Sequence, residues 1–502
     1  MYRVDNDLLS VQEARILVEN AREAQKLLAA FSQEKLDKIV GSMAAEVRKY
    51  ARELALMSQE ETGFGRWQDK LIKNIFVSDY LWRQIKDMKV VGIIAEDREK
   101  RTLDIGVPLG VIVALLPATN PVSTAIYKAL LAVKSGNAIV FSPHPKAKKA
   151  IGKVLEILIR TAEGSGLPAG AIGYLQRSAP QGTLEMMRHK DTALILVTGV
   201  PKLIREAYKS GKPVIYGGPG NGPAFIERSA DIRQAVADII ASRTFDNGII
   251  SASEQSIVVE ECIAAQVRRE LEKKGAYFLS PREAEELGKL FLRPDGSINS
   301  EIVGKPALDL ARRIGISVPE TTRVLLSEQS YVSGSNPYSR EKLCPVLAFY
   351  IEKDWQDACE KCIELLLNEG QGQTLVIHSR NEEVIREFAL KKPVSRLLVN
   401  TPATLGGIGA TTNLFPALTL GCGAAGGSFT SDNVSPLNLI NIRKVGYGVR
   451  TLEDLTKSAQ TLEDAGLAVG VGPAVRQFQE SPEDLKELLK RILAQLTAPG
   501  KV

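Results

Sequence analysis

The segment at residues 245–255, FDNGIISASEQ, has the residue types expected around a nucleophile. An Asp-Asn-Gly turn, two isoleucines and small polar residues could hold Ser251 in a tight pocket. A serine nucleophile needs a neighbouring base, and the sequence pairs none of the chain's three histidines with Ser251. Ser251 to Glu254 also match a helix capping box, so a purely structural role for this serine stays open.

Two further segments could bind or stabilise a reacting group. Asn120 lies between two prolines in LLPATNP, where a rigid amide could donate to a developing oxyanion, although a turn asparagine is the alternative. Residues 217–223, GGPGNGP, have enough glycine for the backbone to approach a phosphate or nicotinamide, although such segments also form ordinary turns. No G-x-G-x-x-G follows the first strand expected in the middle of the chain, so the usual dinucleotide fingerprint is absent.

Hydrophobic periodicity predicts the elements that position these segments. Helical spacing runs from Val11 to about Arg83, and alternating apolar and polar residues predict a hairpin at about 88–106. Strands GVIVALL, NAIVF, AIGYLQ, TALILVTG and KPVIYGG then alternate with helices, two of them at 123–134 and 146–163, which indicates a parallel sheet with crossovers. Ligands of such sheets bind at the carboxyl ends of the strands, so the candidate binding loops are 117–121, 142–145, 198–201 and 217–223.

The rest of the chain predicts a second α/β region and a separate ending. The second region runs from about Ala224 to Asn433, with SIVVEE, TLVIHS and SRLLVN as strands. NLINIRKVGYGV predicts one more strand. An amphipathic helix at 482–496 follows, with Ser481 and Pro482 suited to its start.

Composition argues against several classes of function. The 64 basic and 59 acidic residues give a net charge of +5, which with 6% aromatic residues does not suggest nucleic acid as a partner. The most apolar run, VPLGVIVALL, is too short to span a membrane, and the amino terminus does not read as a secretory signal. Five cysteines at scattered spacings, with Cys359 and Cys362 in a helical pattern, favour no metal site and a reducing cytoplasm.

Eight segments, in this order, resemble the CoA-acylating branch of the aldehyde dehydrogenase superfamily: LLPATNP, FSPHPKAKKA, LVTGVPKLIREAY, GGPGNGP, TFDNGIISASEQ, EKLCPVLA, LVNTPATLGGIG and LTLGCGAAGGS. The resemblance implies an α/β fold with a Rossmann-like cofactor domain, an α/β catalytic domain and a small β oligomerisation flap. The family carries cysteine at the position of Ser251. We interpret Ser251 as an engineered substitution that leaves the chain nearly inactive. A naturally inactive nucleotide- or CoA-binding homologue and a hydrolytic aldehyde dehydrogenase are the alternatives.

The resemblance also implies a mechanism for the cysteine form, an NAD-dependent oxidoreductase. A thiolate at position 251 adds to a short-chain aldehyde, and Asn120 with a backbone N–H holds the oxyanion. Hydride passes to NAD, with NADP left open, and CoA takes the acyl group from the enzyme thioester. Ile215 and Tyr216 stand where hydrolytic relatives carry a glutamate base, which favours CoA over water. The implied cofactor-binding residues are Pro117, Thr119, Ser142, His144, Thr198, Gly199, Gly217, Gly218, Gly220, Asn221 and Glu341.

The same resemblance implies a domain plan and partners. The cofactor domain spans 1–223 with an oligomerisation hairpin at 88–106, the catalytic domain 224–432, the oligomerisation strand 433–449 and a carboxyl-terminal extension 450–502. A homodimer or homotetramer is expected. The helix at 482–496 resembles the peptides that carry enzymes into bacterial microcompartments, so shell proteins are candidate partners. Docking of this helix on its own oligomer is the alternative.

Overall fold

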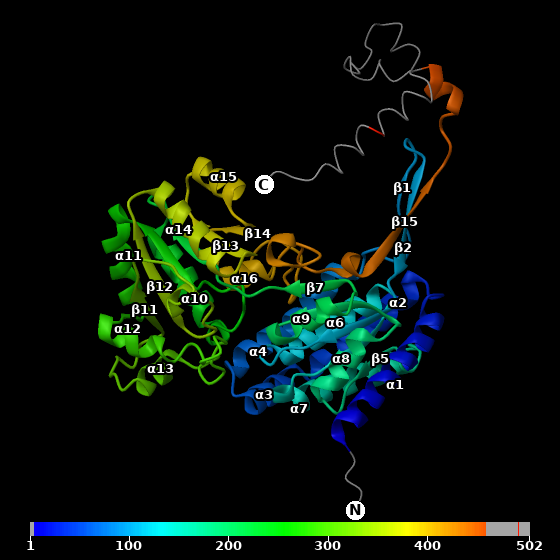
Figure 1. The fold of residues 1–502 in the computed structure, drawn as a ribbon, viewed down its shortest axis with the longest axis horizontal. Coiled ribbons are helices and arrows are strands. Elements are labelled where there is room, and N and C mark those ends of the chain that lie inside the picture. The colour runs from blue at the N-terminus through cyan, green and yellow to red at the C-terminus, as the bar shows by residue number, and fades with distance from the viewer. Residues whose placement is uncertain (1–4, 458–489, 491–502) are drawn as a thin grey trace, which may run out of the picture. The chain divides into compact units, whose positions relative to one another are not determined.

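The computed structural model describes residues 5–457 and 490 (Figure 1). Helices open the described chain, as the periodicity predicts: α1 (Asn6–Leu28), α2 (Gln33–Lys49), α3 (Ala51–Thr62), α4 (Trp67–Ile75), a π-helical turn η1 (Phe76–Tyr80) and α5 (Leu81–Ile85). Asp5 and Ser32 cap the first two helices by accepting backbone N–H bonds of 2.9 and 3.3 Å. Apart from residue 490, the expected helix at 482–496 lies outside the described residues.

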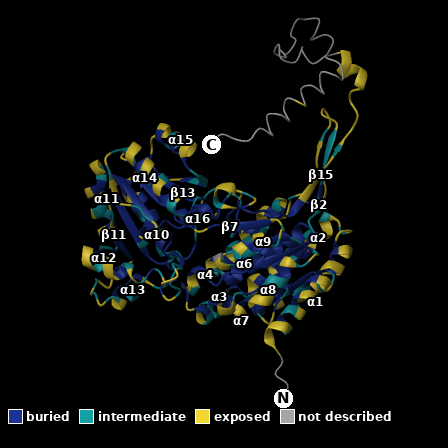
Figure 2. Ribbon diagram, viewed as in Figure 1, coloured by how far each residue is buried: buried dark blue, intermediate teal, exposed yellow. Residues whose placement is uncertain are grey.

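A parallel sheet in the order β5-β4-β3-β6-β7 forms the first α/β region. Its strands are β3 (Val111–Leu115), β4 (Ala138–Ser142), β5 (Ile172–Tyr174), β6 (Thr192–Thr198) and β7 (Val214–Gly217), joined through α6 (Pro121–Lys134), η2 (Pro145–Ala147), α7 (Lys148–Gly164), α8 (Pro180–Arg188) and α9 (Pro201–Lys209). Ile112 and Ala114 pack with α2, α6 and α7, whereas Val111 and Val113 pack with α1 and α8. Because both faces are covered, most residues of these strands are apolar and buried, and Figure 2 shows the interior of this region in dark blue.

Proline marks the helices in this region that the sequence analysis missed or misplaced. Helix α6 begins at Pro121 rather than at residue 123, and α8 and α9, which were not predicted, begin at Pro180 and Pro201. The fixed φ of proline suits the first helical position, where its missing N–H would have no intrahelical partner. A proline after a strand was therefore the available signal for each of these helix starts.

A second parallel sheet, in the order β10-β11-β12-β9-β8-β13-β14, forms the other α/β region. The sequence predicts β9 (Ser256–Glu260), β13 (Gly372–His378) and β14 (Val394–Val399), and the structure adds β8 (Pro223–Ile226), β10 (Ala276–Phe278), β11 (Val324–Glu328) and β12 (Val346–Glu352). The helical elements of this region are α10 (Ile232–Thr244), η3 (Phe245–Gly248), α11 (Glu261–Lys273), α12 (Pro281–Gly288), α13 (Ala307–Arg313), η4 (Pro337–Ser339), α14 (Trp355–Asn368), α15 (Glu382–Lys391) and α16 (Ala403–Gly407). Phe225 and Val258 pack against α14 and α15, whereas Ala224 and Ile257 pack against α10 and α11. The expected α/β fold is confirmed, and the structure adds that the sheet of the second region is parallel as well.

A small sheet in the order β1-β2-β15 contains the expected hairpin and the later strand. The hairpin is β1 (Gly92–Asp97) and β2 (Thr102–Pro108), and β15 (Ile440–Gly446) follows the short turns η5 (Ala424–Gly426) and η6 (Pro436–Leu439). Among the described residues, 96–103 and 444–457 belong to a compact unit of their own, in which the Tyr447 N–H donates to the Arg101 carbonyl at 3.1 Å. Among the described residues we find no helix with the length and apolar character that a bilayer crossing requires.

Candidate active site

Ser251 lines a cavity of about 150 Å³ together with most of the residues that the sequence singles out. The carboxyl ends of β3, β6 and β7 supply Thr119, Asn120, Thr198, Gly199, Gly217 and Gly218, and Glu341 comes from the loop before β12. Parallel strands end at the same edge of their sheet, which is why loops distant in sequence share one cavity. The sequence-based expectation that these loops meet agrees with this geometry.

The remaining wall of the cavity is mainly apolar, and the sequence pointed to only part of it. Its members are Tyr216, Pro219, Ile249, Ile250, Ile298, Leu343, Ile408, Leu418 and Leu420. Ile249 and Ile250 were expected beside Ser251, and Tyr216 and Pro219 lie in or next to the glycine-rich segment that the sequence also singles out. The others come from segments whose meeting depends on the packing of the whole fold.

The loop that carries Ser251 is a tight turn and not a helix start. The Ser253 N–H donates to the Ile250 carbonyl at 2.9 Å, and the next element is strand β9, which begins at Ser256. The capping-box alternative for Ser251 is therefore wrong. Gly220 lies directly against this turn, because a Cβ atom on Gly220 would sit 1.7 Å from the Ser251 carbonyl oxygen.

The Asp-Asn-Gly sequence shapes the approach to this turn. Asp246, Asn247 and Gly248 have positive φ angles of 47°, 54° and 74°. Asp, Asn and Gly are the residues that adopt the left-handed region at least cost, so the local sequence fits the backbone that it must form. The Asn247 amide then fastens the loop by donating to the Gly304 carbonyl at 2.8 Å.

Asn120 precedes α6 but does not cap it with its side chain. Its Oδ1 accepts from the Lys73 ammonium, and its Nδ2 lies 3.4 Å from Thr119 Oγ1. A simple role as a helix cap or turn residue is therefore not what the structure shows for this side chain. The amide lies on the same cavity as Ser251.

Glu341 is buried beside the glycine loop. Its Oε1 accepts from the Gly220 N–H at 2.9 Å, and its own N–H donates to Glu369 at 2.6 Å. Burial raises the pKa of Glu341 to about 8, and the charge of Glu369 acts in the same direction. The Gly220 N–H and the charge of Arg243 lower this pKa but do not offset the burial.

Five of the sequence-predicted residues lie outside the set that lines the cavity. Pro117 packs beside Gly199, Gly220 supports the Ser251 turn, and the Ser142 hydroxyl pairs with that of Thr183 at 2.7 Å. His144 Nδ1 accepts from the Lys146 N–H at 3.1 Å, and burial together with the Lys146 charge lowers its pKa. The Asn221 amide donates to the Ser339 and Leu365 carbonyls at 2.8 and 3.1 Å, which ties the glycine loop to α14.

Sequence reasoning also missed two lysines that reach the site from α4. Lys70 and Lys73 are buried at 3% and 1% exposure, and both contact Asp246 of the Asp-Asn-Gly turn. Two lysines three residues apart normally indicate a solvated helix face, so no direct signal in the sequence pointed to them. Both lysines also contact the segment that carries Asn120.

Comparison with known proteins agrees with this geometry. The model described as "Aldehyde dehydrogenase family" matches residues 7–278. The succinate-semialdehyde dehydrogenase (acetylating) of Clostridium kluyveri is 36% identical over 86% of this chain and 95% of its own length. The chain belongs to the aldehyde dehydrogenase family. The family expected from the sequence is thereby confirmed.

Other members of the aldehyde dehydrogenase family align over most of the chain. The bifunctional aldehyde-alcohol dehydrogenase AdhE of Escherichia coli (strain K12) is 42% identical over 87% of this chain and 49% of its own length. The chain thus spans about half the length of the first curated relatives it matches. The crystal structure of an acetylating aldehyde dehydrogenase from Geobacillus thermoglucosidasius is 46% identical, with a TM-score of 0.87 over 90% of this chain and 99% of that one.

Proposed function

We propose that this aldehyde dehydrogenase has the architecture of a CoA-acylating enzyme and carries serine at the nucleophile position. The observation that supports it most is the shared cavity of Ser251 and Asn120 at the carboxyl ends of the first sheet. The acetylating relative from Clostridium kluyveri and the acetylating structure from Geobacillus support CoA as the acyl acceptor. In this proposal a thiol at position 251, as in Ser251→Cys, restores the activity.

The size and lining of the cavity suit a short, mainly apolar aldehyde. A cavity of about 150 Å³ is large enough for a molecule the size of benzene. Isoleucine and leucine side chains form much of its wall, so removing an apolar chain from water into this cavity is favourable. Acetaldehyde and propionaldehyde therefore fit better than an aldehyde with a charged tail.

The residues at the cavity also fit a nicotinamide cofactor. Thr198, Gly199 and Gly217 end adjacent parallel strands, the position at which such sheets bind dinucleotides. Glu341 uses Oε1 for the Gly220 N–H, and its Oε2 is left to hydrogen-bond with a ribose hydroxyl. When bound, the nicotinamide would accept the hydride of the aldehyde. NAD is the proposed form, with NADP tested beside it.

The chain's own residues would supply the nucleophile and the oxyanion donor. A thiolate at position 251 would add to the aldehyde carbonyl, and the Asn120 Nδ2 would donate to the oxyanion that forms. The resulting enzyme thioester would pass its acyl group to the CoA thiol, which forms one thioester bond as the other breaks. Tyr216 and the fully buried Ile215 supply no carboxylate where hydrolytic relatives place a base, so water has no activator from that position.

The test compares the chain with its Ser251→Cys variant. Thiols reach their reactive anion near neutral pH, whereas a serine hydroxyl needs a dedicated base, so NADH formation from propionaldehyde and CoA should appear only in the variant. Replacing NAD by NADP in the same assay decides the cofactor. A variant that binds the cofactor without turnover refutes the proposal and supports the inactive nucleotide- or CoA-binding homologue. Carboxylate release without CoA supports the hydrolytic alternative.

The proposed assembly and location rest on resemblance. We propose a homodimer or homotetramer in the cytoplasm, packaged inside a bacterial microcompartment through the helix at 482–496. Deleting residues 481–502 should abolish co-assembly with shell proteins while the oligomer measured by light scattering stays intact. Unchanged co-assembly defeats the packaging proposal, and a smaller oligomer supports docking of the helix on its own assembly.

A further inference from the structure

Helix α4 buries its polar side chains and exposes its apolar ones. Asp69, Lys70 and Lys73 are at most 8% exposed, whereas Ile72 and Ile75 are 53% and 38% exposed. An amphipathic helix normally faces its apolar side inward, and a buried ammonium group costs free energy unless it is paired and hydrogen-bonded. The hydrogen-bond partners of Lys70 and Lys73 therefore indicate the role of this buried polar face of α4.

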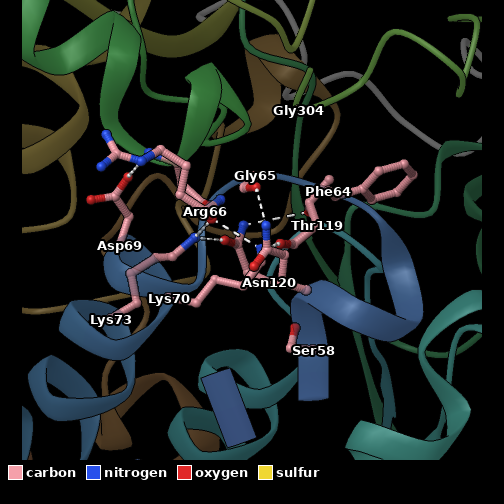
Figure 3. A network of polar contacts seen from close by, with 12 residues as sticks. Ser58, Phe64, Gly65, Arg66, Asp69, Lys70, Lys73, Thr119, Asn120 and Gly304 are labelled. Atoms are coloured by element: carbon pink, nitrogen blue, oxygen red, sulfur yellow. Dashed lines mark hydrogen bonds and ion pairs between the residues drawn. The ribbon is translucent and has the colours of Figure 1, made fainter. Parts of the chain in front are cut away.

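Lys73 joins the nucleophile loop to the segment that carries Asn120. Its ammonium group contacts both Asp246 Oδ2 and Asn120 Oδ1. Lys70, one turn earlier, donates to the same Asp246 oxygen at 3.0 Å and to the Thr119 carbonyl at 3.0 Å. Figure 3 shows both lysines reaching from α4 toward Thr119 and Asn120.

Asp246 is a fixed anchor for Lys73. Its Oδ1 accepts from the Arg66 N–H at 2.6 Å, and its own N–H donates to Asp69 at 2.8 Å. Gly65 lies so close that a Cβ there would be 1.9 Å from Asp246 Oδ1. One backbone N–H and the close packing of Gly65 thus hold the carboxylate, and Asp69 fixes the backbone of Asp246, so the ammonium that it binds has a defined position.

An ammonium group can only donate, so it selects which end of the Asn120 amide it binds. Oδ1 must face Lys73, and Nδ2 is left as the end that can donate into the cavity that Asn120 shares with Ser251. We infer that Lys73 is a positioning residue, which fixes the orientation of the Asn120 amide so that an N–H and not a carbonyl oxygen faces the developing oxyanion. The inference rests on the proposed function, in which Asn120 is that donor.

The charge state of Lys73 agrees with this role. Burial lowers the pKa of Lys73 to about 8, although the Asp246 charge opposes the shift, and the charge of Lys70 adds to it. The group therefore remains mostly an ammonium at neutral pH. Hydrogen bonds from a charged donor are stronger than neutral ones and also polarise the amide that accepts them.

The test uses Ser251→Cys as its parent and compares Lys73→Met with Lys70→Met. Methionine keeps most of the apolar stem and removes the charge in both cases. Loss of one oxyanion donor costs about 10²- to 10³-fold in kcat, and we expect Lys73→Met to lose about 10²-fold with the KM for NAD unchanged. Lys70→Met should lose clearly less kcat than Lys73→Met, because Lys70 shares Asp246 but donates to the Thr119 carbonyl and not to the Asn120 amide.

A double-mutant cycle separates positioning from general damage. If Lys73 acts through Asn120, then Asn120→Ala combined with Lys73→Met should be no slower than Asn120→Ala alone. Losses that multiply, or equal losses in Lys73→Met and Lys70→Met, overturn the inference. If the methionine variant does not fold, Lys73→Gln replaces it in the cycle. The glutamine amide can still donate to Asn120 Oδ1, so Lys73→Gln should retain more activity than a variant without a donor. An inactive parent refutes the proposed function itself, which is a distinct result.

Discussion

Gly220→Ala should disable the nucleophile position by displacing the backbone of Ser251. A Cβ on Gly220 would lie 1.7 Å from the Ser251 carbonyl oxygen, 2.5 Å from its carbonyl carbon and 2.8 Å from its Cα. All three atoms are backbone, so no side-chain rotation relieves the overlap. The position of residue 251 is thus directly coupled to the absence of a side chain at residue 220.

The size of the effect follows from these distances. Cβ contacts below 3.0 Å are essentially absent from proteins, so the two backbones must separate by about 1.3 Å. A displacement of about 1 Å at a reacting group can cost about 10²-fold in rate, and overpacking of this kind costs about 1–3 kcal/mol in stability. In the Ser251→Cys background we therefore expect kcat to fall by about 10²-fold while the protein remains folded.

The assay is CoA-dependent NADH formation from propionaldehyde, with urea unfolding measured in parallel. Gly164→Ala is the matched control, because a Cβ on Gly164, the last residue of α7, meets no atom within 4 Å. That control should keep full activity. If Gly220→Ala retains kcat within about threefold of the parent, residue 220 does not confine the nucleophile turn and the reasoning is wrong.

Two further predictions concern pH and packing. Burial raises the pKa of Glu341 to about 8 in the folded protein, whereas the carboxyl of the unfolded chain loses its proton near pH 4.5. Between these two pH values the folded state binds the extra proton, so the contribution of Glu341 to the free energy of unfolding falls as the pH rises. Glu341→Gln should therefore reduce the fall in unfolding free energy between pH 5 and 8, and an unchanged pH dependence contradicts the assignment. Phe388 is fully buried and its ring stacks on Phe225 at 4.8 Å, so Phe388→Ala should cost about 3–5 kcal/mol in urea unfolding. Leu390→Ala, on the same helix but 82% exposed, should cost less than about 0.5 kcal/mol.

The predictions from sequence succeeded where local pattern and chemistry coincide. Strands such as β3 and β6 are continuous apolar runs between helices, and that periodicity is a property of the backbone segment itself. The glycine loop and Asn120 follow predicted strands, so the topology of a parallel sheet was enough to expect them together. The strands β8, β10, β11 and β12 were not recognised from the sequence.

The sequence by itself determined the family, the two α/β regions and the loops that could hold a nucleophile and an amide donor. Only the tertiary structure decided that Ser251 does not cap a helix, that Glu341 meets the Gly220 N–H, and that α4 turns Lys73 inward. The physical reason is separation along the chain. Lys73 and Asp246 are 173 residues apart, and a buried ammonium is tolerable only once folding brings its carboxylate and carbonyl partners to it. Local periodicity carries no information about such a pairing.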